Sequence, residues 1–512
     1  MKQDSLRHLV LILEDQLNPG LTALKKFPHS PAVLIESKRA FSQFPYHKKR
    51  ITFLVSAMRH FAEELRSHGR EVHYYPLRAD EYKDSIAGLR ECLKITQTDT
   101  LVVTQPNDYH TREWIGSLSS KLGVAVEICP SNLFLTDVDD FKRWVSSIRS
   151  PLMETFYRSM RKRHKVLLDK DGGPEGGKWN YDSDNRKPLK AGLRIPATKK
   201  INPDQVTLAA IEDVAREFPS HPGDGEDFNL PVTRAEARSW LAHFIEHKLS
   251  LYGDYQDALV AENGTLFHSL IGPLLNAGLL TPLECIGAAE QAYRNRGAPL
   301  NSVEGFIRQI LGWREYIYGM YQTFMPEYRT RNHWGFSHDL PDFFWTGKTK
   351  LNCLKITIND LLKTSYSHHI QRLMIICNFA TLAGINPQQV NDWFLSMYID
   401  SHDWVVTPNV IGMGMNSDGN FLATKPYISS AAYVNRMSNY CKGCSYSPKD
   451  RIGDKACPFN FLFWQFLDEH KGELNNNLRM KMMLKNLERI PQEELVLIKQ
   501  RSKRFLEQEL KG

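Results

Sequence analysis

The sequence predicts an α/β N-terminal domain with a parallel, Rossmann-like sheet, joined by a basic connector to a large all-α domain. Three observations predict this architecture. Strand-like and helix-like patterns alternate over residues 1–140, basic residues are concentrated in the connector at 141–231, and helical periodicity dominates over 232–512. Alternating strands and helices are typical of a parallel sheet covered by helices.

Five short runs rich in apolar and β-branched residues predict the strands of the first domain: HLVLIL (8–13), AVLIE (32–36), EVHYYPL (71–77), TLVVTQ (100–105) and VAVEIC (124–129). A helix is predicted over 50–69, because its apolar periodicity ends on Gly69. No G-x-G-x-x-G motif follows the first strand, so the usual dinucleotide fingerprint is absent. A ligand site is still expected at the carboxyl ends of the strands, where residues 14–20 and 36–39 fall.

Positive charge is concentrated at the start of the connector. Residues 141–200 contain 16 Lys and Arg against 6 Asp and Glu, in a chain whose net charge is +7. This excess indicates either a polyanionic partner, with nucleic acid the leading candidate, or simply a solvated charged surface. The stretch 169–192 has no apolar period and predicts a long loop. Trp179 within it favours a functional loop over a plain linker.

Helical patterns fill the rest of the chain. A helix is predicted to begin at Thr233, because Glu236 follows three residues later and completes a capping box. Further helices are predicted over 303–323, 367–383, 388–400 and 458–470, and amphipathic helices over the last 50 residues. The sequence has neither an uncharged apolar run of 18 residues nor the layout of a signal peptide. We therefore expect a cytoplasmic protein without a membrane segment.

Cys441, Cys444 and Cys457 form the clearest motif that the residues alone provide. Eight cysteines in 512 residues are too few for a disulfide scaffold, so clustered cysteines are better explained as metal ligands. A C-x2-C pair can hold one metal ion from a single tight turn. A closed site needs a fourth ligand, which either Cys353 or Cys377 can supply.

The spacing alone leaves the metal open. A cysteine followed by proline, as at Cys457 and Pro458, is typical of the last ligand of an iron–sulfur cluster. The C-x2-C pair suits structural zinc almost equally well, and free thiols are the third interpretation. Cys377 lies in an apolar helical pattern, so it fits a core residue better than a ligand.

Four stretches of the helical part resemble the flavin-binding motifs of the photolyase/cryptochrome family: YGDYQDAL (252–259), FHSLIGPLLNAG (267–278), EGFIRQILGWREYIYGMY (304–321) and YSHHIQRLMIICNFATLAGI (366–385). The segments GGKWNYD (176–182) and LATKPYISSAAYVNRMSNYCKGC (422–444), with the cysteines, resemble the bacterial branch that carries an iron–sulfur cluster. The resemblance covers essentially the whole chain. It implies the photolyase/cryptochrome fold, FAD in the helical domain and a [4Fe–4S] cluster on Cys353, Cys441, Cys444 and Cys457.

The activity that the resemblance implies is light-dependent repair of (6–4) pyrimidine photoproducts by a monomer that binds UV-damaged DNA. In such enzymes excited reduced FAD passes an electron to a lesion that is flipped out of the duplex, and the electron returns after the bond has split. A cryptochrome-like blue-light photoreceptor without repair activity is the alternative. A zinc-bearing nucleic-acid-binding module is a third hypothesis, independent of the resemblance.

Roles for individual residues follow from the resemblance, and each has ordinary packing or a salt bridge as its alternative. His369 corresponds to the histidine that protonates the lesion in (6–4) photolyases, because histidine can hold and release a proton near neutral pH. His368 is expected to assist, and Tyr427 to line the lesion pocket. Eukaryotic enzymes have another histidine where this chain has Leu373. Electron relay to the flavin is expected from Trp393, Trp345 and Tyr433.

The predicted FAD contacts lie in the four motifs and in the segment 398–409: Tyr252, His268, Ser269, Leu270, Ile271, Gln309, Trp313, Arg314, Arg372, Asp400, Asp403 and Asn409. Gly272 departs from the wider family, which usually has serine there. The resemblance further implies a 6,7-dimethyl-8-ribityllumazine antenna in the α/β domain, near Asp15, Gln16, Glu36 and Lys48. Contacts to DNA are expected from Lys178 and Arg186.

Overall fold

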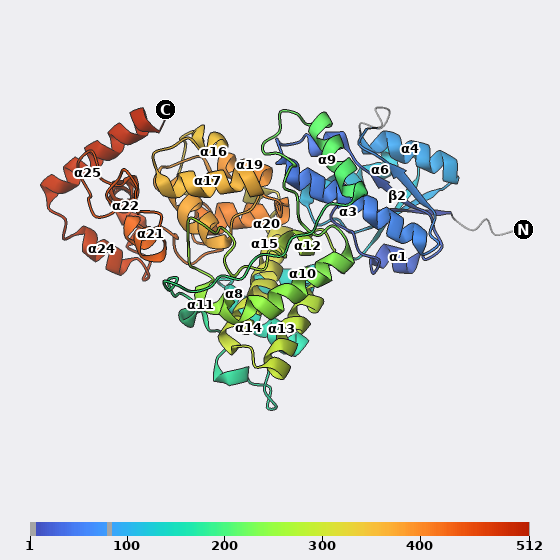
Figure 1. Ribbon diagram of the computed structural model, residues 1–512, viewed down its shortest axis with the longest axis horizontal. Helices are drawn as coiled ribbons and strands as arrows, with labels where there is room; N and C mark the ends of the chain where they lie inside the picture. The colour runs from blue at the N-terminus through green and yellow to red at the C-terminus, as the bar shows by residue number, and fades with distance from the viewer. Residues whose placement is uncertain (1–6, 79–83, 511–512) are drawn as a thin grey trace, which may run out of the picture.

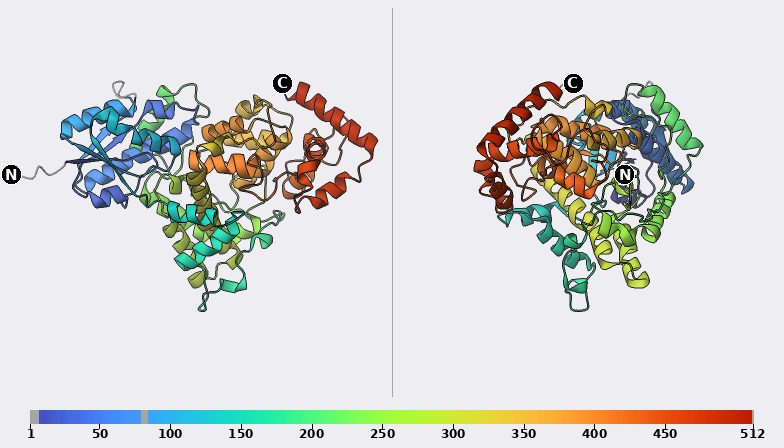
Figure 2. Two further views of the ribbon diagram at one scale, coloured as in Figure 1. Left: turned by 180° about the vertical axis from the view of Figure 1, so that it is seen from behind. Right: turned by 60° about the vertical axis from the view of Figure 1, so that its left-hand side comes forward.

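The computed structural model describes residues 7–78 and 84–510. Its α/β part and its C-terminal helices lie at opposite ends of an elongated molecule, with the helical body between them (Figure 1). The view from behind in Figure 2 shows the same separation. A lobe containing helices α8, α13 and α14 extends to one side of this body in both figures.

A five-stranded parallel sheet forms the core of the α/β part, as predicted. Its strands are β1 (His8–Leu11), β2 (Ala32–Ile35), β3 (Val72–Tyr75), β4 (Thr100–Thr104) and β5 (Ala125–Cys129). The spatial order is β3-β2-β1-β4-β5. The chain order therefore reverses between β1 and β4, and the carboxyl ends of these strands form the crevice where such sheets bind ligands.

Helices cover the sheet on both sides. They are α1 (Thr22–Lys26), α2 (Lys38–Phe41), α3 (Lys48–Ser67), α4 (Ser85–Thr96), α5 (Tyr109–Gly116) and α6 (Leu118–Leu122). The predicted helix over 50–69 corresponds to α3, and Gly69 follows it with a φ of 80°. Glycine adopts this left-handed conformation without the steric cost that a side chain would add.

The two faces of the sheet are buried against different cores. Alternate residues along a strand point to opposite faces. Leu9, Leu11 and Val33 pack into a small cluster with α4, α5 and α6. Val10 and Leu34 belong instead to the large core that continues through the helical body. The sheet and the helical body therefore share one core, which the sequence pattern did not indicate.

The connector at 141–231 contains more helix than the sequence predicted. Helices α7 (Val138–Ser146), α8 (Met153–His164) and α9 (Gln205–Glu217) flank a stretch that has only the short turns η2 (Glu175–Gly177) and η3 (Asp182–Asp184). The predicted loop over 169–192 lies in this irregular stretch. Helix α9 packs back onto α3, where the hydroxyls of Ser56 and Thr207 lie 2.9 Å apart. The dense basic residues of the connector concealed the helical period of α8.

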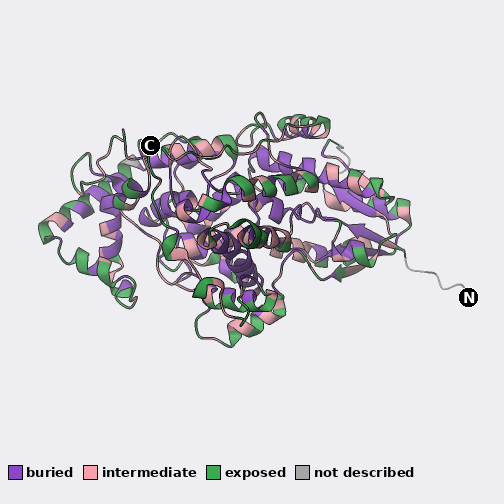
Figure 3. Ribbon diagram, turned by 60° about the horizontal axis from the view of Figure 1, so that its bottom comes forward, coloured by how far each residue is buried: buried purple, intermediate pink, exposed green. Residues whose placement is uncertain are grey.

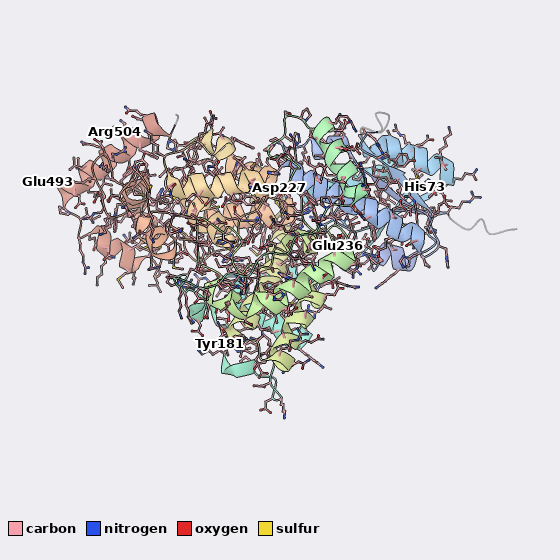
Figure 4. The ribbon with its side chains drawn as sticks, viewed as in Figure 1. His73, Tyr181, Asp227, Glu236, Glu493 and Arg504 are labelled. Atoms are coloured by element: carbon pink, nitrogen blue, oxygen red, sulfur yellow. The ribbon has the colours of Figure 1, made fainter. Side chains whose placement is uncertain are left out.

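Capping and burial define the helices of the body. Helix α10 (Arg234–His247) begins with the predicted capping box, in which Thr233 Oγ1 accepts from the Glu236 amide at 3.2 Å. Glu236 is labelled in Figure 4. Figure 3 shows buried residues concentrated in the middle of the molecule, whereas buried and exposed residues alternate on the C-terminal helices. None of the helices described over 7–78 and 84–510 is long and apolar enough to cross a membrane.

The remaining helices are α11 (Leu249–Tyr255), α12 (Gly272–Asn276), α13 (Pro282–Arg296), α14 (Leu300–Ile307), α15 (Glu315–Phe324), α16 (Phe343–Thr346), α17 (Asn352–Thr364), α18 (Asn378–Leu382), α19 (Pro387–Met397), α20 (Asp403–Thr407), α21 (Ala431–Met437), α22 (Pro458–Glu469), α23 (Lys471–Leu474), α24 (Lys481–Leu487) and α25 (Gln492–Arg504). The described residues include four π-helical segments, namely η4 (Arg308–Arg314), η6 (Gln371–Cys377), η7 (Pro408–Gly414) and η8 (Phe505–Glu509).

Arg59 provides a test of how α9 is held on the α/β part. Its guanidinium lies 2.7 Å from both Glu36 and Asp213, whose side chains are 0% and 3% exposed. Arg59→Met leaves the buried Glu36 carboxylate without its countercharge and leaves Asp213 with Arg216 alone, so we expect the free energy of unfolding to fall by about 3–5 kcal/mol in urea denaturation. The matched control is Arg216→Met, because Arg216 contacts Asp213 from the solvent side. Equal losses in both variants would contradict a specific role for Arg59.

Candidate functional site

A cavity of about 1340 Å³ opens in the helical body. Its walls come from segments far apart in the sequence, including α11, the turn at 268–272, the segment 422–437 and the C-terminal residues Arg479 and Met483. The π-helical segments η4, η6 and η7 all contribute to the lining. Such wide helical turns occur frequently at functional sites. The volume exceeds that of a typical small-molecule pocket, so the cavity can hold a large cofactor together with part of a second ligand.

The turn before α12 has a constrained backbone. Leu270 has a φ of 55°, a conformation that residues other than glycine rarely adopt. The Trp240 indole fixes this turn, because its Nε1 donates to the Ser269 carbonyl at 2.9 Å. A Cβ on Gly272 would lie 3.1 Å from Oδ2 of Asp400. The close carboxylate leaves little room for a side chain, which explains why glycine suits position 272.

Three histidines form a cluster on one wall of the cavity. His268 and His368 stack with ring centroids 4.6 Å apart, and one ring nitrogen from each of the three histidines lies within 4.8 Å of the other two. Burial lowers the pKa of His268 and of His368 well below the usual value for histidine, so both rings are neutral near pH 7. His369 differs, because its side chain is 45% exposed and its Nε2 lies 3.3 Å from Oδ1 of Asp257.

Several buried polar atoms in the cavity wall have no hydrogen-bond partner within the described part of the chain. They include Nδ1 of His368, Oδ1 of Asp400 and Oε1 of Gln256. Arg372 binds the other oxygen of Asp400 at 3.0 Å. Because a buried polar group without a partner is unfavourable, these atoms mark positions where a polar ligand would complete the wall. Donors and acceptors are both present, as a flavin nucleotide requires.

Most of the residues predicted to bind the cofactor line this one cavity: Tyr252, His268, Ser269, Leu270, Ile271, Gln309, Trp313, Arg314, Arg372, Asp400 and Asn409. The residues His368, His369, Tyr427, Tyr433 and Arg186 line it as well. Asp403 does not, because its carboxylate accepts from Tyr321 at 2.7 Å and from Arg329 and Thr407 at 2.6 Å each. Its internal partners direct it toward α15 and away from the cavity.

Arg314 has the salt bridge that sequence reasoning held open as its alternative role. It contacts Glu315 at 3.1 Å and lies 4.0 Å from the Phe134 ring centre. Burial lowers the pKa of Arg314, and the neighbouring Glu315 opposes this change. Glu315 in turn accepts from the amides of Leu135 and Thr136 at 2.8 Å. The pair therefore connects the end of the α/β part to the cavity wall.

The two tryptophans predicted to relay electrons lie outside the cavity. Phe394 lines it, and its neighbour Trp393 is fully buried behind it. Trp393 packs edge-on against Phe344 with ring centres 5.1 Å apart, and its Nε1 donates to the Phe344 carbonyl at 3.0 Å. Trp345, next along the chain, is only partly buried.

Asp15 and Gln16, both predicted to contact the antenna, are buried after β1. Asp15 accepts from Asn107 at 2.8 Å, and Gln16 donates to the Thr104 carbonyl at 2.8 Å. Burial raises the pKa of Asp15 to about 7. Oε1 of Gln16 is buried without a partner within 7–78 and 84–510. Both side chains thus lie at the ligand-binding edge of the sheet, although the protein satisfies most of their polar atoms.

Glu36 and Lys48 are the other two residues predicted to contact the antenna. Their side chains form hydrogen bonds with other parts of the protein. Glu36 accepts from Arg59 at 2.7 Å and from the Tyr74 hydroxyl. Lys48 Nζ donates to the Pro219 carbonyl at 3.1 Å. The structure therefore gives each of the four antenna candidates a partner within the protein.

Four cysteines from three segments line a second, small cavity: Cys353, Cys441, Cys444 and Cys457. All four are free thiols. Burial, together with a smaller contribution from neighbouring cysteines, raises the pKa of Cys441 to about 11 and that of Cys457 to about 12. Four thiolates at this site therefore require a cationic centre. Cys377, the alternative candidate for the fourth ligand, lies in the wall of the large cavity instead.

Gln371 connects the cysteine site to the histidines. Its Oε1 accepts from the His368 amide at 3.0 Å, and its Nε2 donates to the Tyr440 hydroxyl at 3.1 Å. Tyr440 precedes Cys441, and its carbonyl accepts from Asn352 at 2.8 Å. Gln371 and Tyr440 are each 1% exposed. A buried series of hydrogen bonds thus spans the distance between the two sites.

The connector reaches the opening of the large cavity. Arg186 lines the opening and pairs with Asp182, which Arg308 also binds at 2.7 Å. Lys178 is more remote, since its Nζ lies 3.8 Å from Asp184 and its side chain is exposed. Tyr181, labelled in the lower lobe in Figure 4, donates its amide to Glu304 at 3.0 Å.

Sequence reasoning missed Asp257 and Gln371. Asp257 lies within YGDYQDAL, so an acid in a recognised motif was the available signal, but its partner His369 is 112 residues away. Gln371 lies within SHHIQ, beside the predicted histidines, but its amide contacts have no sequence signature.

The fold and this site define the class of the protein. A bacterial class III photolyase from Agrobacterium tumefaciens aligns with a TM-score of 0.56 and 17% identity, over 98% of this chain and 93% of that one. A cryptochrome from Synechocystis aligns with a TM-score of 0.55 and 17% identity, over 81% and 83% of the two chains. The predicted photolyase/cryptochrome fold is therefore confirmed.

Sequence similarity identifies the family within this class. The family described as deoxyribodipyrimidine photo-lyase-related protein matches residues 10–230. A (6-4) photolyase from Agrobacterium fabrum is 43% identical over 477 residues, covering 92% of this chain and 94% of that one. The chain belongs to the photolyase-related family, which confirms the resemblance found in the sequence.

The hydrogen bonds of Gln371 yield a stability prediction. Gln371→Leu leaves the His368 amide buried without its acceptor and removes one partner of the Tyr440 hydroxyl. We expect the free energy of unfolding to fall by about 1–3 kcal/mol in urea denaturation. Tyr440→Phe keeps the hydrogen bond between Gln371 and the His368 amide, so its loss of unfolding free energy should be smaller. An unchanged unfolding midpoint for Gln371→Leu would show that these bonds contribute nothing.

Proposed function

We propose that the protein is a flavin-dependent (6–4) DNA photolyase, which reverses (6–4) photoproducts in UV-damaged DNA under light. The observation that carries the proposal is the cavity, which combines a partly exposed His369–Asp257 pair with buried, unpartnered polar atoms. Basic residues of the connector lie at its opening. The 43% identity to a (6-4) photolyase over most of both chains supports the same conclusion.

FAD would be held by the residues that line the cavity. The unpartnered atoms of Asp400 and His368 offer an acceptor and a ring nitrogen, and Arg372 fixes the Asp400 side chain. The turn at Ser269 and Leu270 presents a constrained backbone and a hydroxyl to the same space. When bound, reduced FAD supplies the light-driven electron that splits the lesion. The residues of this chain would bind FAD, orient it and exclude water from the cavity.

Proton transfer to the lesion is assigned to His369. Its Nε2 faces Asp257, so a second proton would reside on Nδ1 and could be donated from there. The carboxylate keeps the ring oriented and offers it a countercharge. The pKa values of His268 and His368 are lowered by burial, so these two rings stay neutral beside it. The stacked pair therefore packs against the donor without competing for its proton.

A blue-light photoreceptor without repair activity is the second candidate. The cryptochrome from Synechocystis shares the fold. The exposed His369 and the cations at the cavity opening favour repair, since a signalling flavoprotein needs neither. Trp393, Trp345 and Tyr433 are proposed to relay electrons to the flavin in either case.

Two further groups belong to the proposal. A [4Fe–4S] cluster fits the four cysteines, because an all-thiolate set suits iron–sulfur clusters or zinc and the thiolates need a cationic centre. A 6,7-dimethyl-8-ribityllumazine antenna is proposed at the carboxyl ends of β1 and β4, where Oε1 of Gln16 lacks a partner among the described residues. We also propose that the protein acts as a cytoplasmic monomer.

Illumination of the reduced protein with DNA that carries one defined lesion tests the function. We expect the (6–4) photoproduct to revert and the cyclobutane dimer to persist. His369→Asn should lower the repair rate at least about 100-fold, because general acid catalysis is lost, while flavin absorbance is retained. Repair of neither lesion by the unaltered protein would favour the photoreceptor. Wild-type repair by His369→Asn would disprove its proton-transfer role.

Cysteine substitutions test the cluster. Cys353→Ser removes one proposed ligand, so we expect loss of bound iron and of the broad visible absorbance of the cluster, with poor solubility. Cys377→Ser is the matched control, because Cys377 is equally buried but lies in the other cavity, and it should retain iron. Bound zinc in place of iron, or iron lost only in Cys377→Ser, would overturn the assignment.

A further inference from the structure

An unusual surface lies beside the cavity opening, at residues 477–485. Leu478 and Met482 are 75% and 72% exposed, more than any other large hydrophobic residue in the described part of the chain. Arg479, Lys481 and Lys485 are exposed between and beside them. We call this surface the 477–485 segment. Contiguous exposed apolar side chains on a soluble protein usually mark a binding surface.

The segment is fixed in place from behind. Met480, Leu484 and Leu487 recur at helical spacing and are 0–4% exposed, in the core that surrounds α22. Asn477 Nδ2 donates to the Thr424 carbonyl at 2.9 Å, which joins the segment to the chain next to Lys425. The outward side chains at 478, 482 and 485 follow the same helical spacing. These side chains are therefore exposed on a folded element.

The segment is continuous with the cavity. Arg479 and Met483 line the cavity together with Lys425, Tyr427 and Arg186. Burial lowers the pKa of Lys425, and the positive charges of Arg479 and Arg186 lower it further, which shows that the three cations lie near one another. They come from the connector, the 422–437 segment and the C-terminal region.

Among the cations at this surface, Arg186 is paired with Asp182, whereas the others have no such partner among the described residues. In the described part of the chain no carboxylate lies within 4.0 Å of the charged nitrogens of Lys425, Arg479, Lys481 or Lys485. Lys471, just before the segment, is by contrast paired with Glu488 at 3.2 Å. A polyanion would supply the missing countercharge.

We propose that the 477–485 segment is a second DNA-contacting element, beyond the connector. Arg479 and Lys425 bind a backbone phosphate beside the extruded lesion, and Lys481 and Lys485 bind phosphates further along the strand. Leu478 and Met482 pack against the sugars and bases that flank the position in the duplex from which the lesion is extruded. Phosphate contacts position the protein, whereas apolar side chains stabilise an unstacked step. The inference rests on the proposed function, because it requires a DNA ligand.

Salt-dependent binding tests the charged half of the proposal. A labelled duplex with one (6–4) lesion is titrated with the flavin-loaded protein between 50 and 200 mM salt, and binding is followed by fluorescence anisotropy. Arg479→Gln/Lys481→Gln should weaken binding on the order of tenfold and make the slope of log affinity against log salt less steep by about 2, since each lost phosphate contact removes about 0.9. The flavin spectrum and the thermal midpoint verify folding.

The control variant Lys94→Gln/Lys121→Gln removes the same charge from exposed sites on α4 and α6, and should bind like the unaltered protein. If Arg479→Gln/Lys481→Gln and the control variant weaken DNA binding equally, or if neither weakens it, the inference is wrong. Leu478→Ser/Met482→Ser should weaken binding several-fold with an unchanged salt slope. If it instead abolishes self-association in analytical ultracentrifugation and leaves DNA binding intact, the segment is a protein interface and the inference is wrong.

The same titration separates this inference from the proposed function. If the unaltered protein neither binds nor repairs lesion DNA, the proposed function fails and the inference with it. If the unaltered protein repairs the lesion and both segment variants bind it normally, only the inference fails.

Discussion

A cavity of about 1340 Å³ in the middle of a helical body needs walls that cannot collapse inward. Protein interiors otherwise pack to near-crystalline density. Three arginines of the walls, of which Arg308 and Arg314 are buried and Arg372 is partly buried, are each paired with an acid: Arg314 with Glu315 at 3.1 Å, Arg372 with Asp400 at 3.0 Å, and Arg308 with Asp182 at 2.7 Å. Removing one member of such a pair leaves a buried charge, so each pair fixes its geometry strongly.

The backbone contributes to the same constraint. The π-helical segments η4, η6 and η7 widen three helices where they face the cavity. In η6 this places Arg372 toward Asp400 while Gln371, one residue earlier, bonds to Tyr440 near the cysteines. One segment thus positions cavity residues and contacts the region of the proposed cluster. The cysteine site and the cavity are therefore parts of one structural unit, although they are lined by different residues.

Periodicity made the regular parts of the fold predictable. The five strands and the capping box at Thr233 carry local signals, and the structure confirms them. Helix α9 was missed although it carries a local signal, because Asp204 caps it by accepting from the Thr207 amide at 2.9 Å. Its place on α3 depends on tertiary contacts that no local pattern shows: Asp213 binds Arg59, and Thr207 contacts Ser56. The shared core of the sheet and the helical body likewise depends on tertiary contacts. Buried, parallel strands are apolar on both faces, so their sequence does not reveal which face meets which core.

The site was predictable only where the chain carries a motif. The resemblance selected Cys353 over Cys377, and the structure places Cys353 with the other three cysteines, whereas spacing alone could not choose. Asp403 belonged to the same predicted set as Asp400, yet three internal partners hold it outside the cavity. Whether an acid faces a ligand or a neighbouring helix depends on tertiary partners far away in the chain, such as Tyr321 and Arg329, which a sequence pattern does not specify.

Tertiary contacts also order the basic connector. Its composition is that of a solvated loop, but Arg161 is 1% exposed and donates to the Trp179 carbonyl at 2.8 Å. Asn185 is fully buried and donates to the Asn301 carbonyl at 3.0 Å. Arg186 follows directly and is thereby presented at the cavity opening. Because these contacts lie within the protein, they reduce the entropic cost of ordering the loop on binding. A charge excess that could have been diffuse is instead held at the opening of the site.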